Sequence, residues 1–286
     1  MLKKLTTYSF ALLGILVFFN SCKKEYESIE SIDDAKIQAY IKQNSLSMTK
    51  DATGFYYQVV SNGTGAPLLN KDSVFYNLTM KSLEGVVYYN TTAFSNEGNY
   101  LGYLYPSSYR LALEGKNRGS KVRVILPSYL AYGRSGNTAI PPNEVIVTEI
   151  ETYEAPRQID VDDTRIINFL ASKGLTATKD PSRVYYQIIE MGTGQTVDLN
   201  STVTTKYTGR LLTGGVFDQT TGDQTYALTM SVGNFIKGWE ILLGKKKGSK
   251  IRVFIPSDLA YGTAADATIP ANSVLDFDIE IVDVTN

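Results

Sequence analysis

The chain carries few of the side chains that usually perform enzyme chemistry. It has no histidine and one cysteine, Cys22, which excludes Ser-His-Asp hydrolases, cysteine-based zinc sites and an intrachain disulfide. It has 20 tyrosines and a single tryptophan, Trp239. Tyrosine suits half-buried strands and apolar pockets that need a polar tip. Asp218 follows Phe217 at the end of an apolar strand, which is unusual in a core. Most of the tyrosines are expected on strand surfaces, and an enzyme of this composition is expected to work without a histidine base, a metal or a cofactor.

Length and charge narrow the class of protein further. The 286 residues are enough for two ordinary domains, and an apolar fraction of 43% can fill their cores. The net charge is −1, so the chain offers no field for holding nucleic acid. We therefore expect no nucleic-acid partner.

The N-terminus has the features of a secretion signal. Lys3 and Lys4 precede a short apolar run over 10–19, and Cys22 follows Ser21. This arrangement resembles the lipobox of bacterial lipoproteins, in which the peptide is cut before a lipidated cysteine. We expect a signal peptide over 1–21, lipidation of Cys22 and a polar tether over 22–32. The alternative is an ordinary cleaved signal with an unmodified thiol.

Lipidation would place the protein in the cell envelope, anchored to a membrane. The residue after Cys22 is Lys23 rather than the aspartate that retains some lipoproteins in the inner membrane. The outer membrane is therefore expected, with its periplasmic or surface face left open.

One phrase is written twice in the chain. "SYLAYGRSGNTAIP" covers residues 128–141 and "SDLAYGTAADATIP" covers 257–270, an offset of 129 that also relates Tyr56-Tyr57-Gln58 to Tyr185-Tyr186-Gln187. An offset of this length with no net insertion indicates duplication of a whole domain. We expect domains over 33–157 and 158–286.

Each copy is expected to open with a helix followed by strands. Asp33 or Asp34, and Asp162 or Asp163, are candidate helix caps, which is a better interpretation than a calcium loop because no oxygen ligands follow at calcium spacing. In the last strand, over 274–284, apolar residues alternate with Asp276, Asp278 and Glu280, which predicts one wet face. The fold class is α+β: two domains, each a bent antiparallel sheet around a short helix and preceded by a helix.

The second copy resembles the FKBP-type peptidyl-prolyl isomerases. The resemblance lies in "YTGRLLTGGVFDQT", "VGNFIKGWEILL", "KKGSKIRVFIPSDLAYG" and "TIPANSVLDFDIEIVDV". It implies an FKBP-like domain with an aromatic pocket between sheet and helix, lined by Tyr207, Phe217, Asp218, Phe235, Ile236, Trp239, Tyr261, Ile269 and Phe277.

The resemblance also implies roles for these residues. Trp239 would form the floor, and the hydroxyl of Tyr261 and the backbone amide of Ile236 would meet a substrate carbonyl. Tyr207, Asp218 and Tyr261 would be the catalytic residues, with the others binding substrate. A further family aromatic falls by spacing on Leu228, with Tyr226 as the alternative, and the loop "TAADA" lacks the usual glycine.

The first copy has lost most of this set. With the offset of 129, Trp239 corresponds to Arg110, Asp218 to Tyr89, Tyr207 to Leu78, Phe277 to Thr148 and Phe235 to Pro106, whereas Tyr132 and Ile140 persist. An arginine at the floor cannot lie buried without a partner. A closed or rearranged site without activity is therefore expected, with residues 33–157 free to bind an envelope-protein partner.

The sequence supports three functions. The first is isomerisation of X-Pro bonds in envelope proteins by the C-terminal domain, with proline-containing polypeptides as partners. The second is a non-catalytic chaperone that holds polypeptide, and the third is a structural accessory lipoprotein of an envelope assembly. Turnover that is lost on altering the pocket distinguishes the first from the other two.

Overall fold

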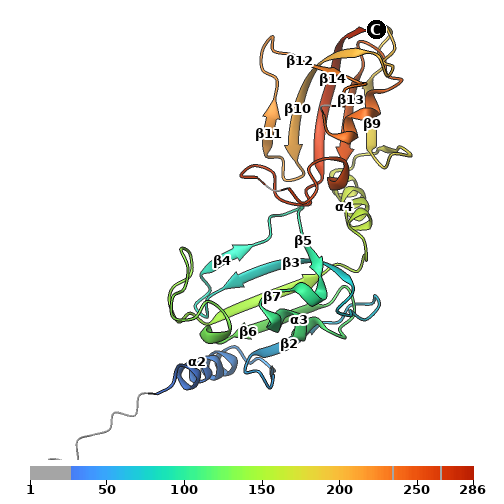
Figure 1. Cartoon of the computed structure of the whole chain (residues 1–286). Helices are drawn as coiled ribbons and strands as arrows, with labels where there is room; N and C mark the ends of the chain where they lie inside the picture. The colour runs from blue at the N-terminus through green and yellow to red at the C-terminus, as the bar shows by residue number, and fades with distance from the viewer. Residues whose placement is uncertain (1–26, 234, 265) are drawn as a thin grey trace, which may run out of the picture.

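The computed structural model describes residues 27–286 apart from residues 234 and 265, and it contains two domains of like architecture (Figure 1). The predicted signal peptide, Cys22 and the start of the tether lie outside the described residues. Within the described ranges, no helix combines the length and apolar character needed to cross a membrane.

The first domain begins with α2 (Ile29–Gln43) and then forms a mixed set of strands and short helices. These are β1 (Thr49–Lys50), β2 (Tyr56–Ser61), β3 (Ser73–Lys81), β4 (Val87–Asn90), β5 (Glu97–Tyr100), η1 (Leu101–Tyr103), α3 (Ser107–Leu113), β6 (Lys121–Leu126), η2 (Ser128–Leu130) and β7 (Ile146–Thr152). Its antiparallel sheet has the order β1-β2-β6-β7-β3-β4, and β5 also pairs with β3.

The second domain repeats this plan from α4 (Gln158–Lys173) onward. Its other elements are β8 (Thr178–Lys179), β9 (Tyr185–Glu190), β10 (Thr202–Leu211), β11 (Val216–Gln219), β12 (Tyr226–Thr229), η3 (Lys237–Leu242), β13 (Lys250–Ile255), η4 (Ser257–Leu259) and β14 (Leu275–Thr285). The sheet order is β8-β9-β13-β14-β10-β11, and β12 pairs with β10. The predicted α+β fold, with a bent antiparallel sheet in each domain, is confirmed.

Each sheet has a hydrophobic core on both of its faces. On one face of the second sheet, Ile166 and Phe169 of α4 pack with Tyr185 and Phe254. On the other face, Trp239 of η3 joins a larger core of strand residues. Neighbouring tyrosines of β9 therefore point into different cores, because successive side chains of a strand alternate between faces.

The paired aspartates do not cap the helices as predicted. The N-cap of α2 is Ser28, so this helix begins before Asp33 and includes the end of the predicted tether. Asp33 is fully buried, and its carboxylate accepts hydrogen bonds from the backbone N–H and hydroxyl of Ser128 at 2.8 and 2.6 Å. Asp162 makes the same pair of bonds with Ser257, at 2.9 and 2.6 Å. The first aspartate of each pair thus ties its helix to the repeated "LAYG" segment.

One residue of the last strand departs from the predicted wet face, on which Asp278 is exposed and Glu280 is partly exposed. Asp276 is only 3% exposed, because the Arg252 guanidinium bonds its carboxylate at 2.8 and 2.9 Å. Arg210 of the neighbouring strand approaches the same carboxylate. Two arginines on flanking strands make this burial tolerable, since a buried charge needs paired and hydrogen-bonded partners.

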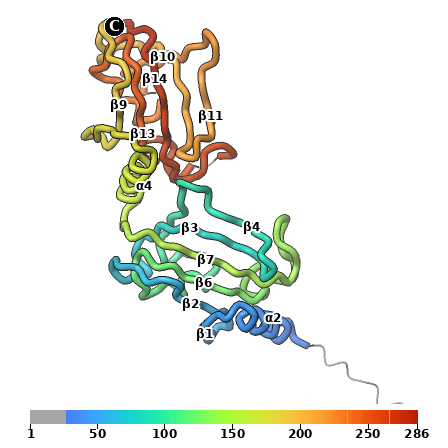
Figure 2. Tube along the Cα trace, turned by 180° about the vertical axis from the view of Figure 1, so that it is seen from behind, coloured from blue at the N-terminus to red at the C-terminus, as the bar shows by residue number. Residues whose placement is uncertain are grey.

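The two domains meet at the connection between β4 and β5 of the first domain, as Figures 1 and 2 show from opposite sides. This connection contacts α4 and the turn at Asn272 of the second domain. Arg165 of α4 is 7% exposed at this junction. Its guanidinium donates to the backbone oxygens of Ser95 and Asn272 and to the side chain of Asn96, at 3.2, 3.0 and 2.8 Å. Phe94 packs edge-on against Phe169 with ring centroids 6.0 Å apart. One buried cation therefore bonds to both domains.

The buried aspartate bond predicts a contrast between two adjacent carboxylates. Asp162→Ala should lower the free energy of unfolding of the second domain by about 2–4 kcal/mol, because it leaves the buried amide and hydroxyl of Ser257 without their acceptor and the buried Arg165 guanidinium without its carboxylate partner at 3.3 Å. Asp163→Ala, which removes a partly exposed pair with Lys179, should cost less than about 1 kcal/mol. Urea unfolding followed by the fluorescence of Trp239 measures both, and equal losses would contradict the assignment.

Candidate functional site

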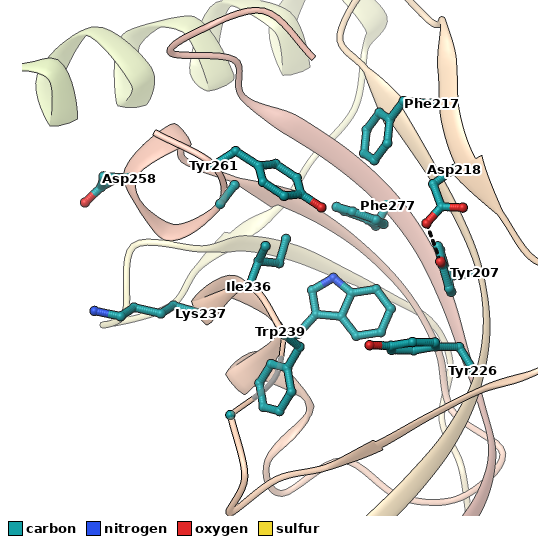
Figure 3. A pocket seen from close by; sticks show the side chains of 13 residues that line it. Tyr207, Phe217, Asp218, Tyr226, Ile236, Lys237, Trp239, Asp258, Tyr261 and Phe277 are labelled. Atoms are coloured by element: carbon teal, nitrogen blue, oxygen red, sulfur yellow. Dashed lines mark hydrogen bonds between the residues drawn. The ribbon is translucent and has the colours of Figure 1, made fainter. Parts of the chain in front are cut away.

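The second domain contains a cavity of about 510 Å³ between its sheet and η3 (Figure 3). It is lined by Tyr207, Phe217, Asp218, Tyr226, Gly233, Phe235, Ile236, Lys237, Trp239, Asp258, Ala260, Tyr261 and Phe277. This list contains every side chain predicted for the pocket except Ile269. That residue is 5% exposed and belongs to the hydrophobic core on which the pocket rests.

An aromatic cluster forms the floor and one wall of the cavity. The indole of Trp239 is 4% exposed and stands nearly perpendicular to Phe277 and Tyr207, with ring centroids 5.5 and 5.2 Å apart. Phe217 packs edge-on against Phe277 at 5.5 Å. Perpendicular packing is a favoured arrangement of aromatic rings, so the surface is both apolar and rigid.

Two glycines allow this close packing. A Cβ on Gly209 of β10 would lie 2.6 Å from the Phe277 ring and 2.8 Å from the Phe217 ring. A Cβ on Gly238 of η3 would lie 2.3 Å from Ile255. Because these separations are too short for real carbon contacts, only glycine permits the rings to approach β10 and η3 to approach β13.

The polar groups of the cavity are a carboxylate and several hydroxyls. The Tyr207 hydroxyl donates a hydrogen bond to Asp218, as the dashed line in Figure 3 marks, and this holds the carboxylate at the edge of the aromatic cluster. The Tyr261 hydroxyl points into the cavity from the turn after η4, on the side opposite Asp218. Burial, and then the negative charge of Asp218, raise the pKa of both tyrosines. Both hydroxyls therefore remain protonated donors well into alkaline pH.

The start of η3 contributes backbone and an indole donor. Ile236 is the N-cap residue of η3, and its carbonyl accepts a hydrogen bond from the backbone N–H of Trp239 at 3.0 Å. The side-chain Nε1 of Trp239 is buried and has no hydrogen-bond partner among the described residues. The predicted role of the Ile236 amide toward a substrate stays a prediction.

Five lining residues lie outside the predicted set of nine, namely Tyr226, Gly233, Lys237, Asp258 and Ala260, and the first of them was the alternative to Leu228. Tyr226 contacts Trp239 with ring centroids 6.1 Å apart and supplies the aromatic that spacing had assigned first to Leu228, which is instead buried in the core. Residues two apart share one face of a strand, so alternation could not distinguish them. Lys237 and Asp258 also line the cavity. In the sequence, only their positions next to "GW" and "LAYG" could have identified them as lining residues.

The corresponding place in the first domain corrects one prediction. Arg110 does not occupy the floor: its guanidinium pairs with Glu114 at 3.4 Å on the surface of α3. Tyr109 lies at the floor instead, 6% exposed, and shares a hydrogen bond of 2.8 Å with Thr148. The offset of 129 failed here because α3 is an α-helix whereas η3 is a 3₁₀ helix, so the inward-facing position shifts by one residue.

Within the described residues, no three His, Cys, Asp or Glu side chains lie close enough together to hold a metal ion. The second-domain cavity presents aromatic rings, hydroxyls, carboxylates and one lysine. Such a lining is able to hold an apolar ring and to donate a hydrogen bond to a carbonyl beside it.

Known proteins are similar in sequence to this domain. A family model described as FKBP-type peptidyl-prolyl cis-trans isomerase matches residues 194–282. The Escherichia coli K12 protein named "FKBP-type peptidyl-prolyl cis-trans isomerase FkpA" is 39% identical over 119 residues, which are 41% of this chain and 42% of that protein. A Haemophilus influenzae protein named "Probable FKBP-type peptidyl-prolyl cis-trans isomerase" is 39% identical over 115 residues, 40% of this chain and 47% of that protein.

Among solved structures, FkpA from Escherichia coli is 34% identical and aligns with a TM-score of 0.39, covering 44% of this chain and 58% of that one. The chain thus spans less than half the length of the two curated relatives. The matched residues begin after β9 and include every residue that lines the cavity. Residues 194–282 of the second domain are therefore similar to the FKBP-type peptidyl-prolyl cis-trans isomerase family.

Proposed function

We propose that the chain is a peptidyl-prolyl cis-trans isomerase whose activity resides in residues 158–286 and acts on X-Pro bonds of polypeptides. The observation that carries this proposal is the aromatic cavity of Trp239, Phe277 and Phe217 with Asp218 and Tyr261 at opposite edges. Lipid anchoring through Cys22 and envelope proteins as substrates are part of the same proposal. They rest on the N-terminal sequence alone.

The reaction needs no nucleophile, because the barrier to turning an X-Pro bond is amide resonance, about 18–20 kcal/mol. When the bond twists, resonance is lost and the carbonyl oxygen carries less negative charge. An apolar cavity therefore favours the twisted state over the planar one, which is the condition for catalysis. Each ~1.4 kcal/mol of such preference gives about a tenfold rate increase.

The polar residues respond to the same change in charge on the carbonyl oxygen between the planar and the twisted bond. With the proline ring on the Trp239 floor, the preceding carbonyl is left free to turn between Asp218 and the Tyr261 hydroxyl. The Asp218 carboxylate repels the more negative planar carbonyl more strongly than the twisted one. Its hydrogen bond from Tyr207 holds the charge in position, and the Tyr261 donor orients the peptide.

The lining argues against the chaperone alternative. A cavity that lacked the family aromatic near Leu228 would favour binding without turnover, but Tyr226 supplies an aromatic ring at the cavity beside Trp239. An isomerase therefore accounts for the lining better than a binding module without turnover.

The two copies of "LAYG" provide a matched test of which domain is active. Tyr261→Phe should lower kcat/KM for a neutral proline tetrapeptide by roughly tenfold, the loss expected when one hydrogen bond that orients the peptide is removed. Tyr132→Phe, at the same place in the first domain, should leave it unchanged. Direct observation of cis-trans exchange by NMR measures both, and an equal loss in Tyr132→Phe would overturn the domain assignment.

The carboxylate has its own test. Asp218→Asn keeps the size of the side chain and an acceptor for Tyr207 but removes the charge, so turnover should fall by about 10- to 100-fold. Asp223→Asn, an exposed position outside the cavity lining, should match the unaltered protein. Full activity in Asp218→Asn would show that the charge takes no part.

The pH dependence follows from the raised pKa values of Tyr207 and Tyr261. A raised tyrosine pKa extends the neutral, donating form to higher pH, and the chain has no histidine. Turnover should therefore be flat from about pH 6 to about pH 9. A bell-shaped profile centred near neutrality would contradict this mechanism.

A further inference from the structure

The first domain retains a cavity of its own. It has a volume of about 320 Å³ and lies between β3, α3 and the turn after η2, the same place in the fold as the isomerase cavity. Met80 lies opposite Thr148 as Gly209 lies opposite Phe277 in the second domain, and Tyr109 lies at the floor, where the second domain has Trp239. Both of these side chains line the first-domain cavity. A glycine against which two rings pack in one domain is thus replaced by a methionine that reshapes the cavity in the other.

The lining of this cavity is rich in tyrosine and carries one charge. Five of its residues are tyrosines and one is acidic: Tyr76, Tyr89, Tyr105, Tyr109, Tyr132 and Glu97. The isomerase cavity differs, since its lining includes Lys237 as well as two aspartates. Among the residues that the structure describes, no lysine or arginine lines the first-domain cavity, and Arg110 lies outside it, paired with Glu114.

The acidic residue is held at the cavity wall. Glu97 of β5 lies directly opposite Tyr76 of β3, and the Tyr89 hydroxyl donates a hydrogen bond to its carboxylate. Glu97 and Tyr89 correspond to Tyr226 and Asp218 of the second domain, so acid and tyrosine have exchanged strands between the copies. Burial and the charge of Glu97 raise the pKa of Tyr76 and of Tyr89 to about 12. The rings stay neutral beside an anion.

This geometry selects among possible occupants. The faces of tyrosine rings attract cations, and the attraction grows where water is displaced. An apolar side chain would bury the Glu97 carboxylate without a counter-charge, which is costly, and an acidic one would be repelled. A proline ring would find Thr148 where the isomerase cavity has Phe277.

We propose that the tyrosine-lined cavity of the first domain is a cation cage that binds a lysine or arginine side chain of a polypeptide, with Glu97 as the counter-ion. The cage is independent of isomerisation and would stand if the second domain had no activity. It makes the first domain a selective peptide-binding unit.

The test uses the soluble chain from residue 27, which keeps both domains, and three peptides that differ at one position. The probes are acetyl-Gly-Lys-Gly-amide and the same peptide with norleucine or Nε-acetyl-lysine in place of lysine. NMR titration of selectively labelled tyrosine rings reports binding at Tyr89 and Tyr132. The lysine peptide should bind about tenfold more tightly than either neutral peptide, the value of a desolvated cation–π contact with a counter-ion.

Two variants and one control test the residues. Glu97→Gln keeps the acceptor for Tyr89 and should weaken the lysine peptide about tenfold while leaving the norleucine peptide unaffected. Tyr132→Ala removes a rim ring that is 37% exposed, so it should fold and should also weaken binding. Glu151→Gln, a matched change at an exposed site on β7, should have no effect. Tighter or equal binding of the norleucine peptide, or equal weakening by Glu97→Gln and Glu151→Gln, would overturn the proposal.

Discussion

The close approach of η3 to β13 is the constraint on which the second-domain site depends. With no side chain at Gly238, the helix lies directly on Ile255, and Trp239 is turned into the space between helix and sheet. Gly209 does the same for the opposite wall, where the Phe217 and Phe277 rings cover β10. A methyl group at either position would push apart the surfaces that form the cavity. The rings supply the apolar surface, and the glycines set its shape.

The same scaffold gives a different cavity in the first domain because other side chains face it. Met80 stands in place of Gly209, α3 is wound as an α-helix, and the buried Tyr109 at the floor takes Thr148 as its hydrogen-bond partner. The structural frame is unaffected, since the buried aspartate still bonds the repeated serine in both copies. Duplication therefore preserved the links between elements and altered the side chains that face the cavity.

The strands and both N-terminal helices could be predicted because their patterns depend on local alternation and on a repeat that is visible in the sequence. Eight of the nine predicted pocket side chains line the cavity. The failures have a common cause, which is that residues close in space were judged by their spacing in the chain. Arg110 was misplaced by a change of helix type. Asp33 and Asp162 were taken as caps although their partners lie 95 residues away, and Asp276 was expected in water although arginines of two flanking strands enclose it.

Arg165 gives the molecule a property that neither domain has alone. Because its guanidinium bonds to backbone and side chains of both domains, the distance between the two cavities does not vary freely as it would across a flexible linker. A polypeptide seated in one cavity would meet the other at a raised effective concentration, provided that its length matches this fixed span. Weak contacts in the two cavities would then add up to a higher affinity for polypeptides of matching length.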